Sequence, residues 1–152
     1  MHLVRLTYVS RLARDCGADE LGKIMTVSRR NNRNLGVTGA LCYSPRGFLQ
    51  ILEGPAGTVN ELYRRIVQDR RHVDCTLVEY TPIHQRDFEH WSMAYIRADE
   101  IDTALLRKYT TRQAFDPFEM MPGQARAFLQ AVAKERAEFL ARQQAAVRKR
   151  KT

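Results

Sequence analysis

Apolar and polar positions follow two different periods along the first hundred residues. In one segment, five apolar side chains keep the i, i+3, i+4, i+7 spacing of a single helix face: Val59, Leu62, Tyr63, Ile66 and Val67. A second helical segment, 18–32, has Leu21, Ile24 and Met25 at similar spacing, and short β-prone runs lie around both. We therefore predict the following elements: strand 3–9, a helix from 18 that ends near Asn34 or Gly36, strand 37–44, strand 47–53, helix 58–69, strand 73–82 and strand 91–97.

Turn residues support these divisions. Pro45-Arg46-Gly47 is typical of a tight turn and joins two strands as a hairpin, while Gly54-Pro55 is expected to end the third strand and start a helix. The order β-α-β-β-α-β-β predicts an α+β fold of the ferredoxin-like kind, a mixed sheet with both helices on one face. The other face of that sheet then requires a different cover.

The C-terminal third of the chain supplies candidates for this cover. We predict a short helix over 101–109 and a long helix over 123–149, separated by a segment with two prolines. One apolar stripe runs along the long helix: Phe128, Leu129, Val132, Phe139, Leu140 and Val147. This stripe has two interpretations, a cover for the bare sheet face or a surface for a second subunit or partner. The chain accordingly divides into a core, 1–97, and a C-terminal helical extension, 98–152.

Composition narrows the class of protein. With 152 residues, 44% apolar and 28% charged, the chain suits one folded domain with an appendage. No apolar run approaches the roughly 20 residues that cross a bilayer, and the charged N-terminal run does not resemble a signal peptide. Cys16, Cys42 and Cys75 are far apart and include no CxxC pair, so we expect reduced thiols, a cytoplasmic location and no metal site.

The net charge of +8 is divided evenly between the two parts of the chain. Residues 1–97 hold 14 Lys and Arg against 10 Asp and Glu, and residues 98–152 hold 11 against 7. The excess in the second part equals the final Arg148, Lys149, Arg150 and Lys151. Such a tail is compatible with nucleic acid or an acidic partner, but it is also typical of a solvated helix end.

Familiar catalytic motifs are missing from the sequence: there is no phosphate-binding glycine loop, no HExxH and no nucleophile elbow. What remains is a set of polar and redox-capable residues on the predicted inner strands and first helix: Tyr8, Asn32, Gln50, Trp91 and Met93. Each has an ordinary structural explanation when taken alone. Gln50 is the hardest to explain in this way, because an inward-facing amide without a partner costs about 1–3 kcal/mol.

Taken together, these residues stand in four longer stretches. The stretches are LTYVSR around Tyr8, SRRNNRNLGVTGALCYSPRGFLQILEGP from Ser28 to Pro55, DRRH from Asp69 to His72, and FEHWSMAYI from Phe88 to Ile96. The combination resembles the BLUF family, the blue-light sensors using FAD, over residues 1–97 without an evident gap.

The resemblance implies a non-covalently bound FAD whose ring lies between the two helices against the sheet. Asn32 would bind the polar edge of the ring, Gln50 would lie beside N5 and C4=O, and Tyr8 would donate a hydrogen bond to Gln50. Further cofactor contacts implied by the resemblance are Ile24, Ser28, Phe48, Arg71, His72 and Met93, with Arg71 and His72 on the ribityl-phosphate side.

The resemblance also implies a photocycle. Blue light drives an electron and a proton from Tyr8 through Gln50, and Gln50 is left rearranged until the dark state returns. Trp91 and Met93, predicted on the strand 91–97, would sense this change and pass it to the C-terminal helices. No substrate is turned over, so we expect no enzyme activity.

About 55 residues follow the predicted core, too few for a cyclase or phosphodiesterase domain. The chain thus resembles the short members of the family, which signal by self-association or through a separate protein.

Two alternative functions are compatible with the same predicted fold. A nucleic-acid-binding module would use the basic tail but lacks paired strand aromatics for base stacking, and an acylphosphatase-like hydrolase would need a phosphate loop that the sequence does not show.

Overall fold

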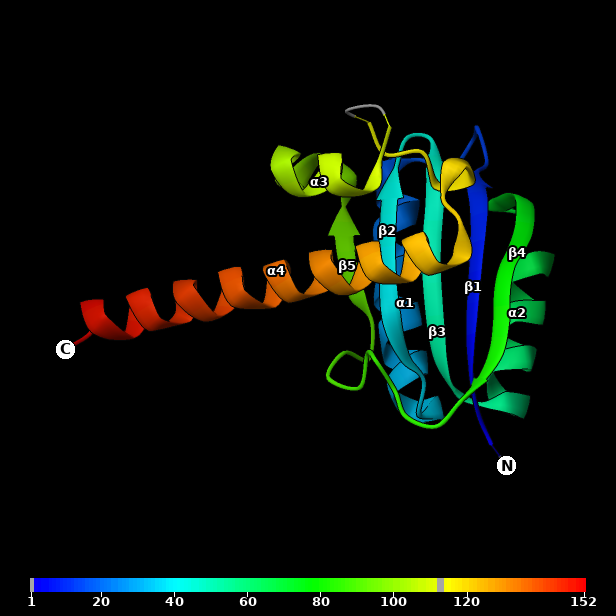
Figure 1. The fold of residues 1–152 in the computed structure, drawn as a ribbon, viewed down its shortest axis with the longest axis horizontal. Coiled ribbons are helices and arrows are strands. Elements are labelled where there is room, and N and C mark those ends of the chain that lie inside the picture. The colour runs from blue at the N-terminus through cyan, green and yellow to red at the C-terminus, as the bar shows by residue number, and fades with distance from the viewer. Residues whose placement is uncertain (1, 112–113) are drawn as a thin grey trace.

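The computed structural model describes residues 2–111 and 114–152, and five strands in this part of the chain form one sheet. The strands are β1 (Leu3–Leu12), β2 (Thr38–Ser44), β3 (Gly47–Pro55), β4 (His72–Ile83) and β5 (Ala94–Arg97). Their order across the sheet is β4-β1-β3-β2-β5 (Figure 1). β5 pairs in parallel with β2, whereas the other neighbours are antiparallel.

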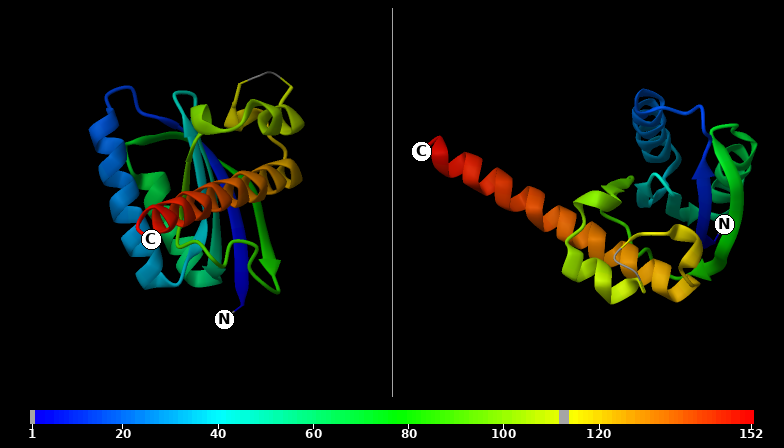
Figure 2. Two further views of the ribbon diagram at one scale, coloured as in Figure 1. Left: turned by 90° about the vertical axis from the view of Figure 1, so that its left-hand side faces the viewer. Right: turned by 90° about the horizontal axis from the view of Figure 1, so that it is seen from above.

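Helices cover both faces of this sheet. α1 (Ala18–Leu35) and α2 (Ala56–Gln68) lie on one face, while α4 (Pro122–Arg150) crosses the other face with α3 (Thr103–Tyr109) beside it (Figure 2). The predicted α+β fold, with two helices on one face and the C-terminal helices on the other, is confirmed.

The alternation of strand residues divides the core into two layers. On β3, Phe48 and Leu52 belong to the layer under α1 and α2, whereas Leu49 and Ile51 belong to the layer under α4. Successive side chains of a strand point to opposite faces, so a polar residue of β3 is assigned to a layer by its position alone. Gln50 lies on the α1/α2 face, and Glu53 lies on the α4 face.

Two glycines fix the ends of the elements that carry the polar residues. Gly36 ends α1 in the left-handed conformation (φ 69°), and the next residue, Val37, donates its N–H to the carbonyl of Asn32 at 2.9 Å. Gly47 opens β3 with φ 143°, and a Cβ at that position would lie 2.3 Å from the carbonyl oxygen of Ser10. Position 47 therefore requires glycine, and the left-handed conformation at position 36 favours it.

Three predicted strand boundaries differ from the structure by two or more residues. β1 continues past Val9 to Leu12, because Ser10 still pairs with Phe48 and Leu12 with His72. β3 continues through Gly54-Pro55, which pair with the first residues of β1.

The third wrong boundary is the start of the fifth strand, which is Ala94 and not Trp91. The chain bends before this point, where the N–H of Trp91 donates to the carbonyl of Phe88 at 3.2 Å. Trp91 and Met93 therefore lie in the connection before β5.

The apolar stripe of the long helix is divided between two environments. Phe128, Leu129 and Val132 are buried against the sheet, whereas Phe139, Leu140 and Val147 are exposed, and the C-terminal half of α4 projects away from the body (Figure 1). The first half thus covers the sheet, and the second half presents apolar side chains to solvent. No helix in residues 2–111 and 114–152 combines the length and the apolar character that a membrane crossing needs.

The division predicts different costs for two truncations on the same helix. Phe128→Ala should lower the free energy of unfolding by about 3–5 kcal/mol, because it leaves a cavity between α4 and the sheet. Phe139→Ala should change it by less than about 0.5 kcal/mol, because this ring is 44% exposed. Urea denaturation of both variants measures the difference, and equal losses would contradict the packing described for α4.

Candidate functional site

The pairing of the three central strands brings the site together. Tyr8 of β1 and Leu41 of β2 both stand directly opposite Gln50 of β3. Directly opposed residues on antiparallel strands point to the same face, so all three side chains face α1 and α2. A register shifted by one residue would turn Gln50 to the α4 face.

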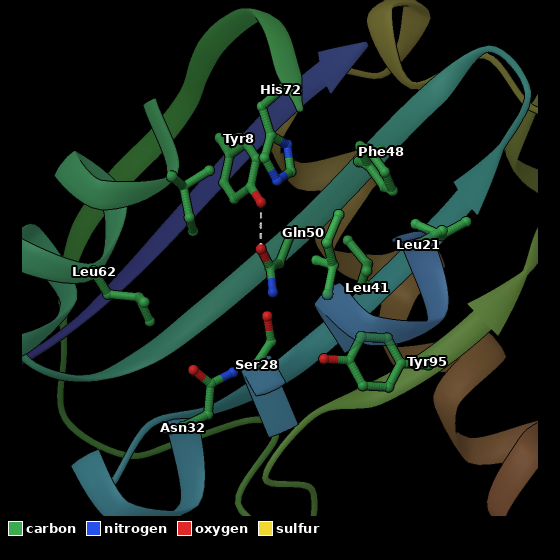
Figure 3. Close-up of a pocket in the computed structure, with 12 residues that line it drawn as sticks. Tyr8, Leu21, Ser28, Asn32, Leu41, Phe48, Gln50, Leu62, His72 and Tyr95 are labelled. Atoms are coloured by element: carbon green, nitrogen blue, oxygen red, sulfur yellow. Dashed lines mark hydrogen bonds between the residues drawn. The ribbon is translucent and has the colours of Figure 1, made fainter. Parts of the chain in front are cut away.

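Gln50 has two polar neighbours among buried side chains. The Tyr8 hydroxyl donates a hydrogen bond to Gln50 Oε1 (Figure 3), and Gln50 Nε2 donates to the Met93 sulfur at 3.4 Å. Burial raises the pKa of the Tyr8 phenol well above its ordinary value, so the phenol keeps its proton at neutral pH and acts as the donor. A thioether sulfur is a weak acceptor, so the amide nitrogen of Gln50 is held loosely.

A narrow cavity opens in front of Gln50, between α1 and α2 (Figure 3). It encloses about 50 Å³ and is lined by Tyr8, Leu21, Ile24, Ser28, Asn32, Leu41, Phe48, Gln50, Leu62, Ile66, His72 and Tyr95. A wider groove of about 400 Å³ shares Ile24, Ser28 and His72 with it and leads outward between the same helices. The space is therefore a slot with an apolar floor and a few polar side chains, the usual form of a cofactor site.

Asn32 contributes a polar side chain without a hydrogen-bond partner in the part of the chain that the structure describes. The residue is only 1% exposed, yet its side-chain amide makes no hydrogen bond with any residue in the described ranges. It points into the cavity beside Ser28 (Figure 3). A buried amide carries a donor and an acceptor, so this position suits a ligand whose edge presents both.

His72 borders the cavity next to Tyr8 and Phe48. Its Nδ1 lies 2.9 Å from the Ser10 hydroxyl, and its ring centroid lies 5.1 Å from that of Phe48. Burial lowers the pKa of His72, which favours the neutral ring against these aromatic neighbours.

Arg71 lies farther out than the other predicted contacts. It lines the outer groove and not the inner cavity, and its guanidinium forms an ion pair with Asp69 at 2.6 Å. It is therefore placed toward the more polar, solvent-facing end of the slot.

Trp91 and Met93 are separated by the sheet. Met93 is buried in the α1/α2 layer beside Gln50, whereas Trp91 packs against Phe88 in the layer under α4. Of the two residues that the sequence paired as sensors of Gln50, the structure places Met93 next to it and Trp91 on the opposite face.

Sequence reasoning missed several residues of the cavity wall: Leu21, Leu41, Leu62, Ile66 and Tyr95. Leu62 and Ile66 were recognised as apolar positions of a helix, and the helix face toward the sheet is also the face toward the cavity. Tyr95 follows Met93 by two residues and shares its side. Its hydroxyl donates to the Met25 carbonyl at 2.8 Å, and burial raises the pKa of Tyr95 to about 12.

Residues 3–94 match the model of one protein family, described as sensors of blue-light using FAD and abbreviated BLUF. The chain belongs to the BLUF family. It is 38% identical over 92 residues to the photoactivated adenylate cyclase subunit beta of Euglena longa, a match that covers 60% of this chain and 11% of that protein. It is also 30% identical over 105 residues to the blue light- and temperature-regulated antirepressor BluF of Escherichia coli, covering 68% of this chain and 26% of the relative. The chain thus spans about a tenth of the cyclase and a quarter of the antirepressor.

Solved structures extend the likeness to most of the chain. The dark-state structure of the BLUF protein BlrB superimposes with a TM-score of 0.75 at 32% identity and covers 88% of this chain and 97% of BlrB. The photo-activated state of BlsA gives a TM-score of 0.76 at 27% identity, covering 86% of this chain and 94% of BlsA. BLUF structures of similar length therefore share the arrangement.

Membership of the BLUF family identifies the cofactor as FAD and the activity as blue-light sensing. The residues present fit this group, because the unpaired Asn32 amide and the loosely held amide nitrogen of Gln50 face one slot whose remaining walls are mostly apolar.

The described residues contain no group of three or more His, Cys, Asp and Glu able to hold a metal ion. The matching family and the relatives named above give the nucleic-acid alternative no support.

The environment of His72 predicts a pH dependence of stability. The folded protein resists protonation of this ring, whereas the unfolded chain binds a proton as the pH falls below about 6.5. The free energy of unfolding should therefore decline from that pH down to the lower pKa of the folded state.

His72→Gln should remove that part of the decline, and His84→Gln, at an exposed position, should leave it in place. Urea unfolding at pH 7.5 and pH 5 measures both variants. A decline that is unchanged in His72→Gln would contradict the assignment.

Proposed function

We propose that this BLUF domain converts blue light into a rearrangement of Gln50, with Tyr8 as the electron and proton donor. The observation that carries the proposal is the buried hydrogen bond from the Tyr8 hydroxyl to Gln50 Oε1 at the inner end of the slot between α1 and α2. FAD, when bound there, would absorb the light and accept the electron.

The Gln50 amide has an oxygen end and a nitrogen end, so its rearrangement would give two different hydrogen-bond arrangements, one in darkness and one after illumination. The oxygen accepts from Tyr8 and the nitrogen faces the Met93 sulfur. A half-turn of the amide would exchange the oxygen and the nitrogen between the two neighbours, whereas its tautomer would make the oxygen a donor and the nitrogen an acceptor in place. The Met93 contact is weak, so little opposes the change on that side, and Met93 would be the first residue to respond to it.

The remaining contacts with FAD are proposed from where each residue lies along the cavity and the outer groove. Asn32 would hold the polar edge of the ring, and Ile24, Ser28 and Phe48 would pack around it. His72 and Arg71 would lie along the ribityl-phosphate side, which agrees with the outward position of Arg71. Trp91, on the other face, would act in the relay and not in the pocket.

We further propose that residues 1–97 form the sensor, that residues 98–152 form the output element, and that the chain described has no enzyme activity of its own. The matched part of the cyclase is only 11% of that protein, and α3 and α4 form no separate catalytic domain. The three unpaired cysteines favour a cytoplasmic location.

The output would be self-association through the C-terminal helices or contact with a separate effector protein. The exposed Phe139, Leu140 and Val147 on the projecting half of α4 support this role. Contiguous exposed apolar patches on soluble proteins often mark interaction sites.

Tyr8→Phe and Gln50→Leu should both bind FAD but lose the reversible red shift of the flavin absorption under blue light. Tyr8→Phe removes the donor, and Gln50→Leu removes the amide that rearranges. Absorption spectra before, during and after illumination measure the effect.

Tyr95→Phe is the matched control, because Tyr95 lines the same cavity but donates to a backbone carbonyl and not to Gln50. It should keep the reversible shift. A normal shift in Tyr8→Phe, or its loss in Tyr95→Phe alone, would contradict the role given to Tyr8.

Phe139→Glu combined with Leu140→Glu should weaken self-association at least about tenfold and leave the reversible red shift intact. Size-exclusion chromatography with light scattering, in darkness and under blue light, measures the assembly. Val67→Glu, at an exposed apolar position of α2, is the control and should change neither property. A wild-type chain that is monomeric in both conditions would contradict self-association and leave the separate effector.

A further inference from the structure

The connection between β4 and β5, residues 84–93, passes from one face of the sheet to the other. Phe88 is fully buried in the layer under α4, whereas Met93 is buried in the layer under α1 and α2. The segment thus touches both the photoactive amide and the layer that α4 covers. A change at Gln50 has in this connection a direct physical route to the opposite face.

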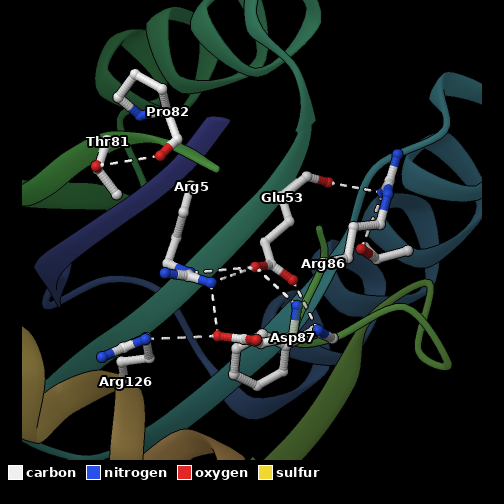
Figure 4. Close-up of polar contacts among 9 residues, drawn as sticks. Arg5, Glu53, Thr81, Pro82, Arg86, Asp87 and Arg126 are labelled. Atoms are coloured by element: carbon white, nitrogen blue, oxygen red, sulfur yellow. Dashed lines mark hydrogen bonds and ion pairs between the residues drawn. The ribbon is translucent and has the colours of Figure 1, made fainter. Parts of the chain in front are cut away.

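One buried carboxylate holds the α4 side of this connection. Glu53 is fully buried and accepts the backbone N–H of Phe88 at 2.7 Å and that of Asp87 at 3.1 Å (Figure 4). Arg5 compensates its charge, with Nε 3.1 Å from Glu53 Oε2 and a terminal nitrogen 2.6 Å from Asp87 Oδ2. Buried charges with several hydrogen bonds keep their geometry, because loss of one partner leaves another uncompensated.

The other contacts tie the same connection to β2 and β3. Arg86 donates to the carbonyls of Gly36 at 2.8 Å and Glu53 at 3.0 Å, and the carbonyl of Trp91 accepts from Gly39 at 3.1 Å. Since the segment is held at these points, a displacement at Met93 cannot be absorbed by a loose loop. It must be passed along the segment or resisted.

Asp87 extends the network to the long helix. Its Oδ2 lies 3.6 Å from Arg126 of α4 (Figure 4). In the described part of the chain, α4 forms one other ion pair with a residue outside itself, between Arg136 and Glu100 at 3.7 Å. One pair therefore joins α4 to the segment before β5, and the other joins it to the turn after β5.

We propose that Asp87 and Arg126 are positioning residues that transmit the state of Gln50 to the first turns of α4. The inference rests on the proposed function, because it needs Gln50 and Met93 to move with light. The route runs from Met93 through the anchored segment 87–93 to Asp87, and then to Arg126. It bypasses β5 and the turn that follows it, which is the route along the chain itself.

The two ion pairs provide a matched test. Arg126 and Arg136 lie on the same helix, their side chains are both 43% exposed, and their ion-pair distances are nearly equal. Arg126→Gln and Arg136→Gln would each be made in the full chain loaded with FAD. Arg126→Gln leaves Arg5 paired with Glu53 and Asp87, so it should fold normally.

Hydrogen–deuterium exchange of peptides from 122–133, in darkness and under blue light, measures the response of α4, and absorption spectra of the same samples record the red shift. In the wild type, light should change the exchange of these peptides. Arg126→Gln should keep the red shift while the light-minus-dark difference falls about two- to fivefold, the range open to a partly exposed ion pair. Arg136→Gln should keep both, and Arg126→Lys should restore at least half of the difference.

A full light-minus-dark difference in Arg126→Gln would overturn the proposal, as would an equal loss in Arg136→Gln, which would place the route after β5. A wild type with a red shift but no change in α4 would also overturn it and leave the photocycle standing. A wild type without any red shift would instead contradict the proposed function, on which the inference depends.

Discussion

Strand β3 must place two polar side chains in the middle of an apolar sheet, one on each face, and the arrangement of the sensor depends on this requirement. Gln50 points toward α1 and α2, and Glu53, three residues later, points toward α4. Neither would be tolerated in the interior without partners. Tyr8 and Met93 satisfy the first, and Arg5 with two backbone N–H groups of the next connection satisfies the second.

The partners chosen have different strengths, and this difference is suited to a switch. Around Glu53 the contacts involve a full charge, and charge-assisted hydrogen bonds are roughly twice as strong as neutral ones. Around Gln50 the contacts are neutral, and one acceptor is a thioether. The Glu53 carboxylate therefore holds the surrounding segments in place, and the Gln50 amide is the group that can rearrange between them.

The fold was predictable from the sequence because its signals are local. The periodicity of α2, the turn at Pro45-Arg46 and the glycine after α1 each identify an element without reference to distant residues. The position of Tyr8 opposite Gln50 follows from strand register, which the family resemblance supplied and local pattern did not.

The start of β5 could not be predicted, because Trp91 and Met93 have the composition of a strand but are held in a bend by contacts with Phe88, Gly39 and Gln50. Glu53 carried no recognisable signal, since a carboxylate on a strand is usually solvated and its partners come from segments more than thirty residues away.

The short parallel pairing of β5 has a consequence for how the molecule opens. β5 contributes four residues at the edge of the sheet and is paired only with β2 among the described strands, whereas β1 and β3 are paired on both sides. Parallel pairing is also slightly weaker per residue than antiparallel pairing. Local opening free energies are lowest where few contacts must be broken, so β5 should be the first strand to detach and the last to reform. Local unfolding of the domain should therefore begin at this edge and leave the three central strands paired.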